Sequence, residues 1–261
     1  MKPKALILQA HGSNRDYDVA EALTLAGADP HPVPLNELRM NKTLLSTFQL
    51  LIVPGGFSYA DALGAGKLLA LDLNSYFNEE ISAFVATGKP VIGICNGFQA
   101  LVKSGILPGD REKRIENSST TLTFNSQGHF ECRWVHLAPI SQTCVWTKGL
   151  DEQIICPIAH GEGNFQTSDA DFVNMLASQD RIALTYVYAD GSPANGDYPA
   201  NPNGSVLDIA GICNPQGNVL GLMPHPENHI YPHQHPQWTR GVEGNSGLAL
   251  FENGVKFASM I

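Results

Sequence analysis

The sequence predicts an α/β fold in which a mostly parallel sheet is flanked by helices and carries a small antiparallel patch. Three observations support this class. Short apolar runs alternate with helical segments early in the chain, strand-like segments follow one another without helices in the middle, and an amphipathic helix comes last. No internal repeat or low-complexity linker divides the chain, so we expect a single domain over residues 1–261.

The first part of the chain has the rhythm of a parallel sheet. We expect a helix after 14, with Asn14 or Asp16 as its N-cap, and helical material over 63–87 that breaks at 64–66. The strands are expected at 4–10, 32–35, 48–53 and 91–94, and they alternate with helical segments along the chain.

Beyond Pro108 the rhythm changes, because strands are expected without helices between them. These strands cover 120–125, 129–137, 144–147 and 154–159. The remaining expected elements are a helix at 169–177, a strand at 182–188, a hairpin of 207–214 with 218–223, and a helix at 246–258. The Pro/Gly/Asn-rich loop at 191–205 has a length that indicates function or contact with a partner.

Composition excludes several classes of protein. A net charge of −9 without a basic run argues against binding to nucleic acid or to an anionic membrane surface. The five cysteines are widely spaced and form no C-x-x-C pair, which argues against a disulfide framework or a zinc site. No leader precedes the first strand and no apolar run approaches the ~18 residues of a membrane span, so we expect a cytoplasmic protein whose ligands are small molecules or proteins.

The segment 90–99, PVIGICNGFQ, carries the strongest chemical signal. Its G-x-C-x-G pattern predicts that Cys95 stands at a tight turn between a strand and a helix, the thiol counterpart of a serine nucleophile elbow. The N-terminus of the following helix favours a thiolate and can hold an oxyanion. Cys95 is therefore a candidate nucleophile, and a buried structural cysteine is the alternative that this segment leaves open.

Two further segments are candidates for the same site as Cys95, at the edge of the sheet. Gly55 and Gly56 follow the third strand, where paired glycines let backbone N–H groups approach a ligand, although an ordinary turn would look the same. His225 and Glu227 lie two residues apart in an extended Pro-rich segment, so their side chains point the same way. The carboxylate can then orient the imidazole toward a thiol; two solvated loop residues are the alternative.

Histidines are dense after this segment, at His229, His233 and His235. The prolines stiffen the segment and no cysteine lies near, so we expect no metal here. A structural or partner-facing loop at 228–240 is the preferred interpretation.

The motifs GICNGFQ, PGGFSYAD and MPHPEN, in one chain, resemble those of the triad (class I) glutamine amidotransferases, which have a flavodoxin-like core. FECRWV, HGEGNF and DIAGICN make the chain similar, more narrowly, to the glutaminase subunits of phosphoribosylformylglycinamidine synthase. The chain departs from that pattern at Ala60 and Gly64, where the family has glycine and arginine, and at Arg15, where a cysteine is common.

The resemblance implies a role for each residue of the candidate site. Cys95 would be the nucleophile, His225 the acid and base, and Glu227 the residue that orients the imidazole. Backbone N–H groups of Asn96 and of the Gly55–Gly56 loop would form the oxyanion hole. The other residues expected to bind substrate are Gln99, Glu162, Asn164 and Phe165.

By the same resemblance, the chain would hydrolyse L-glutamine to glutamate and ammonia. A separate large synthetase subunit would use the ammonia, with ATP and Mg, to convert formylglycinamide ribonucleotide to formylglycinamidine ribonucleotide in purine biosynthesis, and a small accessory subunit is a further possible partner. We expect no cofactor in this chain, since it has no P-loop signature. The alternatives are the glutaminase subunit of another amidotransferase, a free-standing γ-glutamyl hydrolase of the same fold, and a non-catalytic binding module.

Overall fold

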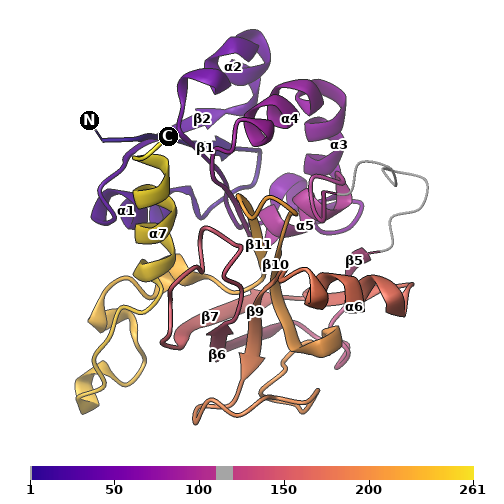
Figure 1. The fold of residues 1–261 in the computed structure, drawn as a ribbon, viewed down its shortest axis with the longest axis vertical. Helices are drawn as coiled ribbons and strands as arrows, with labels where there is room; N and C mark the ends of the chain where they lie inside the picture. Colours follow the sequence, from indigo (N-terminus) through magenta and orange to yellow (C-terminus); the bar gives the residue numbers. More distant parts are fainter. Residues whose placement is uncertain (1, 110–119) are drawn as a thin grey trace.

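The structure is a computed structural model that describes residues 2–109 and 120–261 (Figure 1). A nine-stranded sheet with the order β2-β1-β3-β4-β11-β10-β9-β6-β7 runs through the molecule. Its parallel half consists of β2 (Asp29–Pro34), β1 (Lys4–Gln9), β3 (Leu50–Val53), β4 (Val91–Ile94) and β11 (Val219–Leu222). Each of β3, β4 and β11 is buried throughout, as expected for parallel strands covered on both faces.

The antiparallel half continues the same sheet from β11. It consists of β10 (Ile209–Cys213), β9 (Ile182–Val187), β6 (Glu131–Pro139) and β7 (Ile154–His160). Buried and half-buried residues alternate along β7, as in a strand with one covered face. A separate antiparallel pair joins β5 (Thr120–Thr123) to β8 (Asn164–Thr167).

Helices flank the parallel half on both sides (Figure 1). Helix α1 (Asp16–Leu25) packs against α7 (Leu248–Ala258), and α3 (Lys67–Tyr76) packs against α5 (Asn96–Lys103). The remaining helices are α2 (Leu35–Met40), α4 (Asn78–Ala86) and α6 (Ala170–Ser178). In the described residues, no helix is long and apolar enough to cross a membrane.

The predicted fold class is confirmed, and the antiparallel part is more extensive than a small patch. The expected break in helical material at 64–66 is confirmed, with a second break at Phe77 between α3 and α4. The N-cap prediction is wrong: α1 follows Arg15 without a side-chain cap, and Asp16 instead accepts a hydrogen bond of 2.5 Å from Gln9 Nε2.

The strand predicted at 144–147 is also wrong, because this segment forms turns. Its apolar residues are buried for a different reason. Trp146 is fully buried, and a Cβ atom added to Gly254 of α7 would come within 2.2 Å of its ring. The apolar run therefore marks a segment that packs against α7.

Candidate active site

Cys95 and the His225 segment meet because their strands are neighbours. Cys95 directly follows β4, and His225 comes three residues after β11. These strands run parallel, with Ile94 opposite Leu222, and Cys95 N donates a 2.8 Å hydrogen bond to Leu222 O. Since parallel strands end at the same edge, the sheet itself brings the two segments together.

The elbow, which we define as residues 93–97, is built by close packing. Cys95 has φ 51° and ψ −106°, a conformation that is costly for a residue with a side chain. A Cβ atom on Gly97 would lie 1.9 Å from Val53 O, and one on Gly93 would lie 2.5 Å from Leu101 Cδ1. Both glycines of the motif thus let α5 approach the sheet closely enough to hold the turn.

His225 is held by its carboxylate neighbour. Its Nδ1 lies 2.6 Å from Glu227 Oε1, and the Glu227 side chain has no exposed surface. The Cys95 thiol lies within hydrogen-bonding reach of the His225 ring. A Cβ atom on Gly55 would come within 2.7 Å of His225 Cε1, so glycine at this position makes room for the imidazole.

The charge on His225 depends on the balance of two effects. Burial lowers the pKa of His225, but the Glu227 carboxylate and the negative charge available on Cys95 together outweigh burial and raise it to about 10. At neutral pH the buried imidazole is therefore an imidazolium that can donate a proton.

A cavity of about 170 Å³ opens beside the elbow. Four of the predicted site residues line it, namely Gly56, Cys95, Gln99 and Glu162. The exposed aromatic side chains Phe57, Phe124 and Phe130 also line it. Gly55, Asn96, His225 and Glu227 support the Cys95 side of the site through the contacts described here.

Besides Gly55 and Asn96, two more predicted substrate-binding residues, Asn164 and Phe165, do not line this cavity. Phe165 has no exposed surface and stacks on Phe98, with ring centroids 6.5 Å apart. Asn164 is buried at the start of β8, where its Oδ1 accepts a 2.7 Å hydrogen bond from Gln166 Nε2. In this structure both residues belong to the packing beneath the site.

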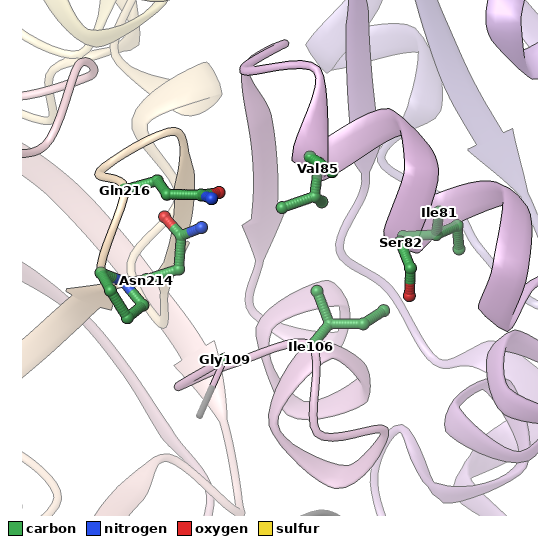
Figure 2. Close-up of a pocket in the computed structure, with 9 residues that line it drawn as sticks. Ile81, Ser82, Val85, Ile106, Gly109, Asn214 and Gln216 are labelled. Carbon is green, nitrogen blue, oxygen red and sulfur yellow. The ribbon is translucent and has the colours of Figure 1, made fainter. Parts of the chain in front are cut away.

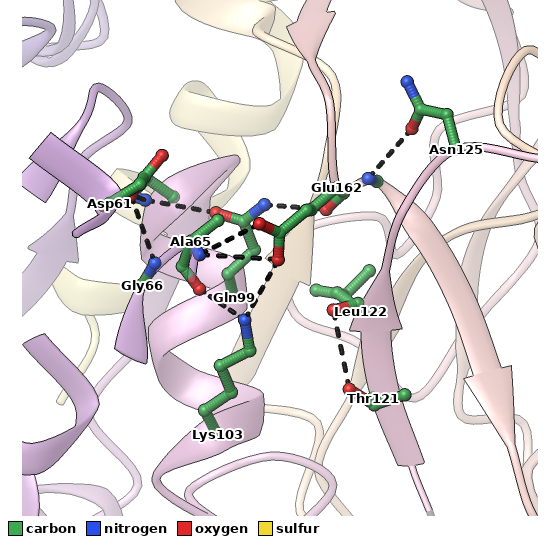
Figure 3. Close-up of polar contacts among 11 residues, drawn as sticks. Asp61, Ala65, Gly66, Gln99, Lys103, Thr121, Leu122, Asn125 and Glu162 are labelled. Atoms are coloured by element: carbon green, nitrogen blue, oxygen red, sulfur yellow. Dashed lines mark hydrogen bonds and ion pairs between the residues drawn. The ribbon is translucent and has the colours of Figure 1, made fainter. Parts of the chain in front are cut away.

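The predicted residues Gln99 and Glu162, together with Asp61, which the sequence did not single out, form a polar wall of the cavity (Figure 3). The Glu162 carboxylate accepts a 3.2 Å hydrogen bond from Ala65 N and lies 3.5 Å from Lys103 Nζ. Gln99 Nε2 donates a 2.7 Å hydrogen bond to Glu162 O. Asp61 also lines the cavity; the quoted motif PGGFSYAD contains it but gave no sign of its role.

Asp61 ends a left-handed turn, which we define as residues 59–61. Tyr59, Ala60 and Asp61 have φ values of 55°, 54° and 51°, each costing roughly 1–2 kcal/mol for a non-glycine residue. The Asn96 side chain ties this turn to the elbow: its Oδ1 accepts from Ser58 N at 3.2 Å, and its Nδ2 donates to Asp61 Oδ1 at 2.9 Å.

His160 is a further buried histidine on the cavity wall. Asn125 Nδ2 donates to the carbonyls of His129 and His160, so Asn125 Oδ1 is the acceptor that faces His160 Nδ1 at 3.1 Å. Nδ1 therefore carries the ring proton. Burial and the charge of His225 lower the pKa of His160 to about 3, which keeps the ring neutral.

Other regions offer less chemistry. A cavity of about 330 Å³ beside α4 (Figure 2) is lined by apolar and uncharged residues, without a thiol or a titratable group among those described. Within 2–109 and 120–261, no three His, Cys, Asp or Glu side chains gather as metal ligands. His229 and His235 instead pack edge-on against Trp134.

Comparison with known proteins shows which family the chain resembles over its length. Residues 2–258 match the family described as CobB/CobQ-like glutamine amidotransferase domains. The chain is 56% identical over 268 residues to the phosphoribosylformylglycinamidine synthase subunit PurQ of Treponema denticola, covering 98% of this chain and 99% of that protein. The corresponding subunit of Dehalococcoides mccartyi is 44% identical, with coverage of 100% and 99%.

Among solved structures, the chain is similar to one in the structure of PurLQS from Thermotoga maritima. The TM-score is 0.74 at 32% identity, and the match covers 98% of this chain and 99% of the other.

Proposed function

Since this chain belongs to the CobB/CobQ-like glutamine amidotransferase family, we propose that it is the glutaminase subunit of a phosphoribosylformylglycinamidine synthase in purine biosynthesis. Both relatives bear that name, and the similarity covers 99% of each of them. The resemblance in the sequence suggested the same subunit. The observation that carries the chemistry is the His225–Glu227 pair, joined at 2.6 Å, beside Cys95 at the edge of a cavity.

The reaction would begin with attack of the Cys95 thiolate on the carboxamide carbon of L-glutamine. The carbonyl π electrons move onto oxygen and give a tetrahedral oxyanion. The N–H groups of Asn96, at the start of α5, and of Gly56, in the cavity wall, are the donors that we assign to this oxyanion. Such donors help because they are already in place when the charge develops.

Collapse of the intermediate would break the C–N bond. The His225 imidazolium donates its proton to the departing nitrogen, so that ammonia leaves and a glutamyl thioester remains on Cys95. The neutral imidazole then takes a proton from water, which attacks the thioester and releases glutamate with regeneration of the thiolate. Glu227 keeps Nδ1 occupied, so Nε2 is the ring nitrogen that exchanges protons.

Ammonia made in this site would pass to a large synthetase subunit, to which we assign ATP and Mg. The solved relative is part of a PurLQS structure, which supports a large-subunit partner and suggests a small accessory subunit. Ammonia released into water would be protonated and lost, so delivery to a docked partner favours efficient transfer.

We further propose that two loops contact the partner. In the first, 191–205, the exposed portion is 191–200 apart from the buried Ala194, because Asn201, Asn203 and Ser205 are buried. Asn203 Nδ2, for example, donates a 2.8 Å hydrogen bond to Gly163 O. The second, 228–240, exposes most of its residues from Pro232 onward. Shortening either exposed portion should weaken complex formation, and unchanged affinity for the synthetase would remove that loop from the interface.

The proposed function is tested by measuring glutamate release from glutamine. The chain is assayed alone and with the large synthetase subunit, ATP and formylglycinamide ribonucleotide, each beside a Cys95→Ala control. Release that rises with the partner and disappears in Cys95→Ala is the expected result. Partner-independent release would favour a free-standing hydrolase, and activity retained by Cys95→Ala would refute the assignment of the nucleophile.

A further inference from the structure

The cavity beside Cys95 has a distinct charge pattern. Of its described lining residues, Asp61 and Glu162 are carboxylates, His160 is neutral, and none is Lys or Arg. Glu162 is partly neutralised by Lys103, whose Nζ lies 3.5 Å from Glu162 Oε2 and 2.5 Å from Ala65 O. Asp61 forms no ion pair in the described residues and feels Lys103 only from a longer distance, so the cavity favours a positively charged group near Asp61.

Asp61 also has a free acceptor. The hydrogen bonds that it accepts in the described part of the chain, from Asn96 Nδ2 at 2.9 Å and from Gly66 N at 3.4 Å, both end on Oδ1. They leave Oδ2 for a ligand, and they fix the carboxylate against Asn96, which follows Cys95, and against Gly66 (Figure 3 shows the contact with Gly66). Burial and the nearby Glu162 raise the pKa of Asp61 and outweigh the lowering effects of its two hydrogen bonds and of Lys103, so a bound cation would relieve an unfavourable charge.

We propose that Asp61 Oδ2 accepts a hydrogen bond from the α-ammonium group of L-glutamine and so selects α-amino carboxamides over carboxamides that lack the amino group. The inference rests on the proposed function, which places the substrate carboxamide at Cys95. The α-ammonium is the one cationic group of glutamine, and it is matched by Asp61, the cavity carboxylate that forms no ion pair in the described residues.

The experiment compares two substrates in three proteins, each in complex with the large subunit. The substrates are L-glutamine and glutaramate, which is glutamine without its α-amino group. Asp61→Asn keeps an oxygen for Asn96 and Gly66 while removing the charge. Asp72→Asn is the matched control, because Asp72 accepts a hydrogen bond from Tyr59 of the same left-handed turn but does not line the cavity.

We expect Asp61→Asn to lower kcat/KM for glutamine by about 10- to 100-fold, the effect of losing one charge-assisted hydrogen bond, while kcat/KM for glutaramate stays unchanged. The loss should fall mainly on KM. Asp72→Asn should leave the ratio between the two substrates as in the wild type. Parallel losses for both substrates in Asp61→Asn would show a structural role and overturn the proposal, as would an unchanged preference for glutamine.

Binding measurements test the role of Asp61 independently of the proposed glutaminase activity. In a Cys95→Ala background, which cannot form the thioester, calorimetry measures the Kd of glutamine and of glutaramate with and without Asp61→Asn. Loss of the preference for glutamine by about 10-fold or more supports the role of Asp61 even if the wild type releases no glutamate. An equal preference in both proteins, or no binding of glutamine by either, overturns it.

Discussion

The elbow and the left-handed turn face the same cavity and both hold side chains at positive φ, yet they are stabilised differently. At the elbow, two glycines let α5 press against β3 and β4, and Cys95 is the single strained residue. In the left-handed turn, three consecutive non-glycine residues are strained, and hydrogen bonds from the neighbouring Asn96 and Gly66 hold its end. One turn is held by packing and the other by polar contacts, so different substitutions should break them.

The largest effect is expected at Gly97, where the obstacle is main chain. Gly97→Ala would place a Cβ atom 1.9 Å from Val53 O, so α5 must move and the elbow must open. We expect a loss of about 3 kcal/mol in the free energy of unfolding, measured in urea, together with loss of glutamate release.

Gly27→Ala is the matched control for Gly97→Ala. Gly27 also has a positive φ, 95°, but open space around its Cβ position. Its substitution should cost about 1 kcal/mol from backbone strain alone. Equal costs at the two glycines would mean that close packing does not hold the elbow.

The two turns should also respond to different ranges of pH. The pKa of His225, beside the elbow, is raised from 6.5 to about 10, so its contribution to stability is complete below pH 6.5 and is lost as pH rises toward 10. We expect the free energy of unfolding to fall by a few kcal/mol over that range, and His225→Gln to abolish most of the fall.

The corresponding effect of Asp61 lies in the acid range. The pKa of Asp61 is raised above 3.8 in the folded protein. Its contribution to the free energy of unfolding is therefore complete below pH 3.8 and is lost as pH rises through the raised value. Asp61→Asn should therefore flatten the pH dependence there, leave the alkaline fall intact, and make the protein more stable at neutral pH. Urea titrations from pH 4 to pH 10 would measure the pH dependence assigned to His225 and the one assigned to Asp61. If Asp61→Asn changed the loss of stability at alkaline pH, the two turns would be electrostatically coupled.

A smaller effect is expected where the two turns are joined. Asn96→Ala removes hydrogen bonds to Ser58, Asp61 and Gln99, and should cost about 2 kcal/mol of stability while raising KM for glutamine. Ser58→Ala removes one hydroxyl donor to Asn96 and should cost about 1 kcal/mol. If both variants lowered the free energy of unfolding by the same small amount, polar contacts would not be what stabilises the left-handed turn.

The smallest effect is expected at Ala60. Ala60→Gly relieves strain at φ 54° but makes the unfolded chain more flexible, so a net gain of about 0.5 kcal/mol should remain. Ala62 is the control, because its φ of −57° is ordinary and glycine there should only destabilise, by about 0.4–1 kcal/mol. Thermal melts of the pair would show opposite signs; a loss at both positions would mean that Ala60 carries no strain.

Local sequence patterns were sufficient for much of the parallel half. Continuous apolar runs predicted β1, β3 and β4, and the G-x-C-x-G pattern predicted the turn at Cys95, because strand burial and tight turns restrict which residues can occur within a few positions. The same patterns could not tell a buried turn from a strand at 144–147, since both are apolar.

The sequence by itself determined which residues could do the chemistry: a cysteine at a glycine-flanked turn, and a histidine two positions before a glutamate. Tertiary structure decided which side chains meet. Parallel pairing of β4 with β11 brings His225 to Cys95, burial takes Phe165 out of reach of the cavity, and a left-handed turn without glycine brings Asp61 into it. The physical reason is that strand pairing and packing join residues far apart in the chain, and no local pattern records those contacts.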